Sequence, residues 1–559
     1  MCPSGTETTE GVNHPLHAFK ATADPDTMYL HEALKQKDRK QFVEAMAKEF
    51  NDQMANGNFT LVRRAMVPKS KRILRAVWQM KRKRDIKTRQ IKKWKARLNI
   101  DGSHQIYGED YDLTYAPVAR WNSIRLLLTL AALFGWKTTQ IDYVLAFPQA
   151  PVDRELYMEI PKGFHVEGAD PKEWVLQLNK NVYGQKQGPR VWNQYLKEKL
   201  VNELGFTQSV TDECVFYRGN VLYLLYTDDS ILCGPDQSEI DLVIKQLKEV
   251  NLNITVEGDI QDFLGVNIER KDDGTVHLTQ PHLIDSILED LRLADPTTKT
   301  KSTPAASSVI LGRHKDSEDF DGSFNYRSVI GKLNYLEKGS RPDIAYAVHQ
   351  CARFCTDPKV EHGKAVKWLG RYLAGTRDKG MILTPDEERG FEVFVDADFC
   401  GLWNQEEANH RDTARSRHGF IISYAGCPIQ WKSQLQTEIA LSSTESEYTG
   451  LSYALRDAIP MMQLLNELKE ANFPIDPEAP KVHCKVFEDN SGALAIAKEF
   501  KYRPRTKHLN VKLHHFRDYV ERKEISIHDI DTESQPADYL TKPLAETPHI
   551  RCRKRTQGW

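Results

Sequence analysis

Two adjacent acids, Asp228 and Asp229, are placed where they could bind metal ions. They lie between the apolar runs VLYLLYT and SILCGP, which predict two strands joined by a tight turn. Magnesium prefers hard oxygen ligands, and in-line nucleotidyl transfer uses two ions about 3.5 to 4 Å apart, held by carboxylates. An Asp-Asp pair in a turn is more often an ordinary solvated turn, so other acids must support this interpretation.

A third acid for this centre is Asp142 in TTQIDYVLAFPQAP, which only folding can bring close to the turn. Four separated acids in the last third of the chain have contexts that a two-metal nuclease would need. They are Asp396 in a strand-like run, Glu447 in a helix, Asp489 at the end of a strand and Asp538 near the start of a final helical segment. Spacing alone identifies neither centre.

Charge is distributed unevenly along the chain. The formal net charge is −1, yet the stretch from Arg63 to Arg97 contains sixteen Lys or Arg residues and a single acid, Asp85. Trp78 and Trp94 lie within this stretch. Such a run can be a solvated helical face, but the like charges repel one another unless a polyanion neutralises them. We therefore expect contact with nucleic-acid phosphates.

The pattern of apolar residues predicts the elements that carry these acids. We expect a helix over residues 26–55, alternating strands and helices to about residue 281, a mainly helical region to about 386, and a linker at 377–390. In the last region we expect a strand at 391–399, a helix at 444–470, and strands at 485–488 and 524–530. The apolar window at 126–136 is too short to span a bilayer and predicts a buried helix.

Several motifs occur in the order found in one family. Gln140-Ile141-Asp142 with Ala146-Phe147, the run YGQKQGPRVW at 183–192, and Tyr226-Thr227-Asp228-Asp229 resemble the QLDVxxAF, YGLKQAPRxW and YVDD motifs of copia-type (Pseudoviridae) LTR retrotransposon reverse transcriptases. In the last region FVDADF, SSTESEY, RTKHL and ADYLTK resemble the ribonuclease H domain of the same elements. The resemblance covers about residues 42–544, nearly the whole chain.

The resemblance implies an α+β multidomain fold, in which a right-hand polymerase with fingers, palm and thumb precedes a ribonuclease H-like α/β domain with a mixed sheet. The implied units are a flexible N-terminal segment at 1–27, fingers and palm at 28–280, a helical thumb or connection at 281–385, the ribonuclease H-like domain at 386–545, and a basic tail at 546–559.

The resemblance also implies roles for individual residues in the polymerase. Asp142, Asp228 and Asp229 would bind the catalytic metals, and Phe147 would be a steric gate against the ribose 2′-hydroxyl. The other substrate contacts would be Lys95 and Arg97 on the triphosphate, Gln187 in the nucleotide pocket, Tyr226 beside the metals, and the turn Leu264-Gly265 at the primer end. An ordinary core phenylalanine and generic phosphate contacts are the alternatives for Phe147 and for the two basic residues.

In the nuclease the resemblance implies that Asp396, Glu447, Asp489 and Asp538 bind metal, with Glu445 as an alternative to Glu447. Arg505, Lys507 and His508 would touch the substrate or belong to a solvated loop. The loop before Asp538 lacks the histidine that many ribonucleases H have, and we expect His528 in the preceding strand.

These implications define the expected function as an RNA-directed DNA polymerase with ribonuclease H activity, using two Mg²⁺ ions per site with Mn²⁺ as a substitute. The expected partners are an RNA template, a DNA primer, the RNA:DNA hybrid, dNTPs, and capsid and integrase proteins of the element, with no membrane. The expected location is intracellular, in cytoplasmic virus-like particles with access to the nucleus. The alternatives are a catalytically silent nucleic-acid-binding relic and an RNA-dependent RNA polymerase; Phe147 and the nuclease motifs disfavour the latter.

Overall fold

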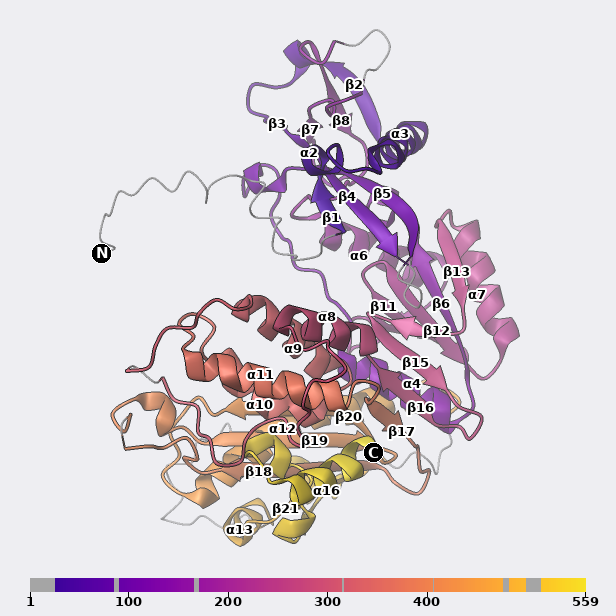
Figure 1. Cartoon of the computed structure of the whole chain (residues 1–559). Helices are drawn as coiled ribbons and strands as arrows, with labels where there is room; N and C mark the ends of the chain where they lie inside the picture. Colours follow the sequence, from indigo (N-terminus) through magenta and orange to yellow (C-terminus); the bar gives the residue numbers. More distant parts are fainter. Residues whose placement is uncertain are drawn as a thin grey trace.

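The structure, a computed structural model, describes residues 26–84, 90–164, 170–313, 316–405, 407–475, 482–498 and 514–559. Figure 1 shows the N-terminal elements at the top and the helices of the middle region lying over the C-terminal sheet at the bottom. Most of the predicted N-terminal segment 1–27 lies outside the described residues. In the part of the chain that the structure describes, no helix has the length and apolar character needed to cross a membrane.

Two small sheets and one long helix form the N-terminal unit. The first sheet has the order β1-β4-β5 and the second β2-β8-β7-β3. The strands are β1 (Thr27–Tyr29), β2 (Phe59–Arg63), β3 (Ile73–Leu74), β4 (Ala76–Arg84), β5 (Ile91–Ile100), β7 (Tyr157–Met158) and β8 (Trp174–Leu178). Helix α3 (Arg39–Ala55) buries Phe42, Met46 and Phe50 against this unit.

The predicted single helix over 26–55 is wrong in its first part. Thr27–Tyr29 is a strand that pairs antiparallel with β4, and a short helix α2 (Leu30–Ala33) precedes α3. Pairing with β4 satisfies the backbone of this segment and buries Met28 and Tyr29, which local helix propensity could not reveal.

A six-stranded sheet with the order β13-β6-β12-β11-β10-β9 follows. Its strands are β6 (Lys137–Tyr143), β9 (Thr207–Gln208), β10 (Val215–Arg218), β11 (Val221–Tyr226), β12 (Asp229–Gly234) and β13 (Ile254–Gly258). The helices of this unit are α4 (Trp121–Leu133), α5 (Ala146–Gln149), α6 (Gly188–Glu198) and α7 (Gln237–Glu249). The apolar window at 126–136 lies mostly in α4 and is largely buried, as predicted.

The middle region is helical, and both of its ends join one sheet. Its helices are α8 (Pro281–Leu291), α9 (Tyr326–Gly339), α10 (Ala345–Ala352) and α11 (Val360–Gly375). The sheet contains β14 (Asp262–Phe263), β15 (Val266–Arg270), β16 (Val276–Thr279) and β17 (Met381–Leu383). The predicted linker at 377–390 is therefore wrong, because it contains β17, which pairs with β16 and buries Met381 and Leu383.

A five-stranded mixed sheet organises the C-terminal region. Its order is β20-β19-β18-β21-β22, with antiparallel pairs up to β18 and parallel pairs from β18 to β22. The strands are β18 (Phe391–Asp398), β19 (Arg417–Tyr424), β20 (Cys427–Leu435), β21 (Cys484–Glu488) and β22 (Ile525–Asp529). The helices are α12 (Ser443–Glu470), α13 (Ser491–Lys498), α14 (Arg517–Glu521), α15 (Asp538–Thr541) and α16 (Glu546–Gln557). The predicted α+β multidomain fold with a mixed C-terminal sheet is confirmed.

The segment 546–559, predicted only as a basic tail, forms helix α16 and packs into the molecule. His549 and Cys552 are buried, and the Gln557 side-chain amide donates to Asp343 Oδ1 and to the Gly380 carbonyl oxygen, each at 3.0 Å. The Trp559 indole donates to the same carbonyl at 2.6 Å. The C-terminal helix is thus tied to the helical middle region.

One buried arginine joins three units. Arg125, in α4, donates through Nη1 to the Ile429 carbonyl of β20 at 2.7 Å and through Nη2 to the Lys338 carbonyl of α9. Its guanidinium lies over the Trp431 ring, 3.8 Å from the centroid. Burial lowers the pKa of Arg125 to about 9, although Glu337 opposes the effect. One hydrophobic cluster also runs from α4 through the β18–β20 strands to α12.

We expect Arg125→Met to lower the free energy of unfolding by about 3 kcal/mol, because the carbonyls and Glu337 lose a buried cationic partner. Urea unfolding followed by tryptophan fluorescence measures this change. Arg120→Met is the matched control, since Arg120 precedes the same helix and is exposed. Equal stabilities of the two variants would contradict the role given to Arg125.

Candidate active sites

The strand register brings the first group of acids together. Asp142, in β6, and Asp229, in β12, are direct cross-strand partners. Asp228 lies in the turn between β11 and β12, where Tyr226 pairs with Asp229. The turn is fixed from two sides, because Tyr143 N–H donates to the Asp228 carbonyl at 2.9 Å and the Trp192 indole donates to the Thr227 carbonyl at 2.6 Å.

Burial and mutual repulsion act on these acids. Burial raises the pKa of Asp229 to about 7, and the carboxylates of Asp228 and Asp142 add to the shift. Burial and Asp228 also raise the pKa of Asp142, while Lys95 opposes the effect. Such a centre favours protons or a cation as counter-charge.

Glu257 is an acid near this centre that the sequence patterns did not single out. It adds to the raised pKa values of Asp142 and Asp229, after burial and the neighbouring aspartates. The pairing of β13 with β6 shifts register between Val256 and Gly258, so Glu257 lies in a bulge. In the sequence, only the glycine that follows Glu257 within a strand indicated a bulge at this position.

Three of the predicted substrate residues lie on β5 or beside the Tyr183 ring. Lys95, in β5, is half-buried; burial lowers its pKa, and Asp142 is the carboxylate that opposes this shift. The Arg97 guanidinium lies 5.0 Å from the Tyr183 ring centroid. That ring contacts Phe147, with 5.2 Å between centroids. Arg97 and Phe147 thus share the Tyr183 ring, and Lys95 lies two residues before Arg97 on the same strand.

Gln187, which is predicted to line a nucleotide pocket, is enclosed in the structure. Its side chain is 0% exposed. Gln187 accepts from the Gln105 amide at 3.0 Å and donates to the Asp110 carbonyl at 3.1 Å. These two hydrogen bonds connect the loop after β5 to the start of α6. They also satisfy the polar atoms of the Gln187 amide, as burial requires.

Gly184, in the same motif, is required by geometry. Its φ of +90° lies in the left-handed region, and an added Cβ would come within 2.2 Å of the Ile100 carbonyl oxygen. The loop at 183–188 therefore packs directly on the end of β5, which explains why the motif has glycine after Tyr183.

The predicted primer-end turn lies beside Tyr226. Leu264 and Gly265 both have positive φ values, of 52° and 70°, between β14 and β15. The Tyr226 ring contacts the Phe263 ring edge-to-face at 6.3 Å. Tyr335 of α9 donates its hydroxyl to the Leu264 carbonyl at 2.5 Å, so the helical region is connected to this turn.

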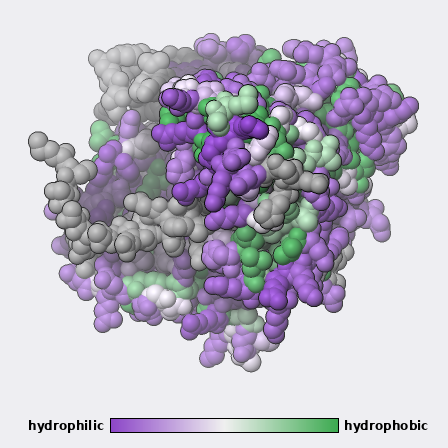
Figure 2. Space-filling model, turned by 90° about the horizontal axis from the view of Figure 1, so that it is seen from above, coloured by the Kyte–Doolittle hydropathy of each residue, from purple (hydrophilic) through white to green (hydrophobic). Residues whose placement is uncertain are grey.

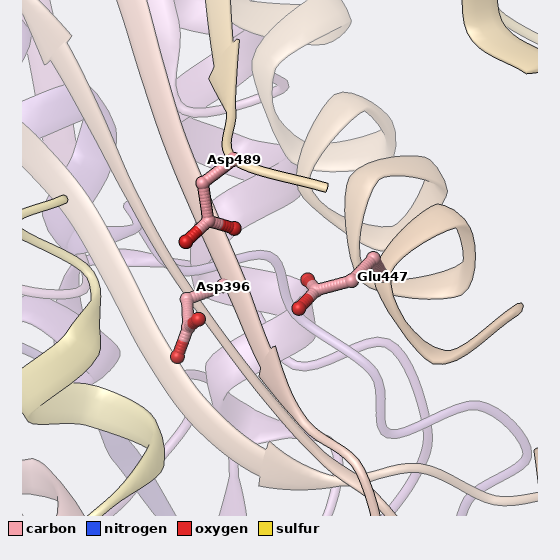
Figure 3. Close-up of side chains that lie close together, drawn as sticks. All are labelled: Asp396, Glu447 and Asp489. Atoms are coloured by element: carbon pink, nitrogen blue, oxygen red, sulfur yellow. The ribbon is translucent and has the colours of Figure 1, made fainter. Parts of the chain in front are cut away.

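Asp396, Glu447 and Asp489 form a compact second centre. Figure 3 shows them arriving from a strand, a helix and the segment after a strand. Their ligand oxygens lie within 4.8 Å of one another, and among the described residues this is the one group of three or more potential metal ligands that close. Asp396 and Glu447 are buried, with 4% and 6% exposure. Carboxylate oxygens are the donors that Mg²⁺ prefers.

Asp538 joins this centre through Lys542. Lys542 Nζ lies 2.9 Å from Asp538 Oδ1 and 3.8 Å from Asp396 Oδ2. Thr541 also donates its hydroxyl to Asp396. Burial raises the pKa of Asp396 to about 7 although Lys542 opposes the shift. The lysine offsets part of the negative charge of the four acids.

Glu445 and Glu447 have different places in α12. Glu445 accepts from the Leu441 N–H at 2.8 Å, and its own N–H donates to the Ser442 hydroxyl, so it belongs to the start of the helix. Glu447 is the glutamate beside Asp396 and Asp489. His528 lies in β22 and contacts the Ser526 hydroxyl at 2.6 Å. Arg505, Lys507 and His508 lie outside the described residues.

Comparison with known proteins identifies the family. Residues 56–306 match the family model described as reverse transcriptase (RNA-dependent DNA polymerase). The chain is 31% identical over 545 residues to the retrovirus-related Pol polyprotein from transposon TNT 1-94 of Nicotiana tabacum. It is also 31% identical over 507 residues to the Pol polyprotein from transposon RE2 of Arabidopsis thaliana. The chain belongs to the copia-type retrotransposon reverse transcriptases.

The matches cover different shares of each protein. They include 95% and 90% of this chain but 39% and 33% of the two plant polyproteins. The chain therefore spans less than two fifths of those relatives. A solved foamy viral protease-reverse transcriptase in complex with double-stranded DNA aligns with a TM-score of 0.43 and 13% identity, covering 88% of this chain and 69% of that one.

The raised pKa of Asp229 predicts that the stability of the metal-free protein depends on pH. The folded carboxyl holds its proton up to about pH 7, against an ordinary value of 3.8, so this group's contribution to stability is lost as pH rises through that window. In chelator, we expect Asp229→Asn to gain stability relative to the wild type between pH 5 and pH 7 or so. Thermal unfolding at each pH measures the difference.

Asp241→Asn, in an exposed position of α7, is the control for loss of an aspartate. A difference between wild type and Asp229→Asn that stays constant with pH would show that Asp229 is not buried as described.

Proposed function

We propose that this chain is an RNA-directed DNA polymerase with ribonuclease H activity. The observation that carries the proposal is the register of β6 and β12, which places Asp142 opposite Asp229 and next to the Asp228 turn. Three carboxylates on adjacent strands and their turn suit a pair of Mg²⁺ ions, with Mn²⁺ as a substitute. Membership in the reverse transcriptase family supports the same activity.

Asp142, Asp228 and Asp229 would hold the ions, which when bound activate the primer 3′ hydroxyl and stabilise the leaving pyrophosphate. Lys95 and Arg97 would neutralise the incoming triphosphate, because both are cations of β5 and the charge of Asp142 acts on Lys95. Phe147, held against Tyr183, occupies space beside the sugar and disfavours a 2′-hydroxyl. Tyr226 and the Leu264-Gly265 turn position the primer end.

For the second centre we propose hydrolysis of the RNA strand of a hybrid. Asp396, Glu447 and Asp489 are close enough to share a divalent cation, and Asp538 is tied to them through Lys542. Their buried carboxylates match the hard-oxygen donor set of Mg²⁺. A polymerase that makes RNA:DNA hybrid needs a nuclease to free the new strand, so the two activities suit one chain.

The basic β4–β5 hairpin supports an RNA template, DNA primer and hybrid as partners. The basic stretch at 63–97 includes these two strands. Its charges therefore lie mainly on strands, whereas the alternative interpretation expected the exposed face of a helix. Lys81 lies opposite Lys95 and Lys83 opposite Lys93, and like charges directly opposite are destabilising without an anion. Figure 2 shows that hydrophilic residues cover most of the face seen from this end.

The wider setting is proposed from the relatives named as Pol polyproteins. We propose association with capsid and integrase proteins of the element, an intracellular location in cytoplasmic virus-like particles with access to the nucleus, and use of dNTPs. We also assign fingers and palm to 28–280, thumb or connection to 281–385 and ribonuclease H to 386–545.

Two substitutions should separate the activities. We expect Asp228→Asn to lower dTMP incorporation on poly(rA) with an oligo(dT) primer and Mg²⁺ by about a hundredfold or more, and to leave hybrid RNA cleavage intact. Asp396→Asn should have the reverse effect. Primer extension and cleavage of a labelled RNA:DNA hybrid measure the two outcomes.

Thr227→Val is the matched control in the turn, since valine has a similar shape and also branches at Cβ; we expect it to keep polymerase activity. No incorporation by the wild type above the Asp228→Asn level would favour a silent nucleic-acid-binding relic over the enzyme.

Removing the gate should relax sugar selection. We expect Phe147→Val to raise the use of ribonucleotides relative to deoxynucleotides by about tenfold or more, because the smaller side chain leaves room for a 2′-hydroxyl. Competing rNTP and dNTP incorporation measures the ratio. Phe399→Val, a partly exposed phenylalanine in the C-terminal region, is the control, and an equal ratio in both variants would reject the gate.

A further inference from the structure

Glu488, the last residue of β21, is a carboxyl that the proposed reactions do not use. Its side chain is 0% exposed. Oε1 accepts from the Asn490 N–H at 3.1 Å, whereas Oε2 is buried without a hydrogen-bond partner among the described residues. A carboxyl in this position needs an explanation, because its burial costs free energy unless a donor or a cation compensates it.

The sheet register places Glu488 behind the second centre. Phe394 of β18 lies opposite Phe487 of β21 in a parallel pair, so Glu488 faces the other side of the sheet from Phe487, together with Val486. Helix α12 packs on this side of the sheet. Its Gly450 lies so close to β18 that an added Cβ would be 3.3 Å from the Val395 side chain. Glu488 is therefore enclosed between β21 and α12.

Glu447 comes from the same helix, and its ligand oxygen lies within 4.8 Å of that of Asp489, the residue after Glu488. The Oε2 atom of Glu447 is also buried without a hydrogen-bond partner in the described chain. Burial raises the pKa of Glu447 well above its ordinary value, and Glu488 is the charged group that adds most to the shift. Glu447 and Glu488 thus each bring a buried, unpartnered carboxylate oxygen to the side of the sheet that α12 covers.

We propose that Glu488 is a positioning residue of the nuclease centre, which directs Glu447 toward the divalent cation and raises the affinity of the centre for it. The inference rests on the proposed ribonuclease H function. The cation neutralises carboxylates that otherwise repel one another. Glu488 adds one more buried negative charge to this group and so increases the repulsion that the cation relieves. Partners behind metal ligands tune affinity in this way.

Calorimetric titration of the metal-free full chain with Mn²⁺ tests the proposal. Asp396→Asn identifies the binding event that belongs to the nuclease centre, because it removes a ligand there. We expect Glu488→Gln to weaken that event by about tenfold and to leave the polymerase-centre event unchanged. The rise in melting temperature that Mn²⁺ produces should shrink in parallel.

Asp529→Asn is the matched control, since Asp529 lies opposite Glu488 on β22 and is exposed. If Glu488→Gln does not fold, Glu488→Leu replaces the carboxyl with an apolar group of similar size. Wild-type affinity in the folded variant would overturn the role of Glu488 alone. An unchanged titration of Asp396→Asn would overturn the nuclease centre and the role of Glu488 with it.

Discussion

The arrangement of the molecule depends on a cation that is buried where three units meet. The Arg125 guanidinium has left water, and it donates to one carbonyl of the C-terminal sheet and another at the end of α9. Taking a charge out of water is offset only when its partners are all in place. The six-stranded sheet, the helical region and the C-terminal sheet therefore have one relative position in which this charge is stabilised. Both groups of acids belong to units that Arg125 joins.

The two groups of acids differ in how closely their carboxylates lie together. In the Asp396–Glu447–Asp489 group three carboxylates already lie within 4.8 Å of one another and are largely enclosed. Asp142 and Asp229 lie on adjacent strands and Asp228 in the turn beside them; all three are partly exposed, and they do not form such a close group. Polymerase ions commonly take several ligands from substrate phosphates and water, so fewer protein contacts are needed there.

Local sequence patterns predicted the elements whose signal is local. The hairpin around Asp228 and the long helix starting near Ser443 follow from periodicity, and the acids were found because ordered motifs surround them. Structure that depends on residues far away in the sequence could not be predicted from local patterns. Thr27–Tyr29 is a strand because β4 lies beside it, Gln187 is buried because the loop after β5 needs its amide, and Glu257 nears Asp142 through a bulge. In each case the deciding partner is far along the chain.

Strand β17 has a consequence for how the helical region could be exchanged or lost. The chain leaves the four-stranded sheet after β16 and returns to it as β17, so the helices form a closed insertion whose two ends are hydrogen-bonded neighbours. Excision of the insertion together with β17 would move the edge of the sheet from β17 to β16 and expose the backbone groups of β16 that now pair with β17, and exposed edges invite pairing with other chains. A recombination event that kept β17 would leave the edge of the four-stranded sheet unchanged. The new connection would need to span only the short distance between the end of β16 and the start of β17. The pairing of β16 with β17 thus defines the boundary at which this helical region could be removed while the rest of the sheet keeps its hydrogen bonds.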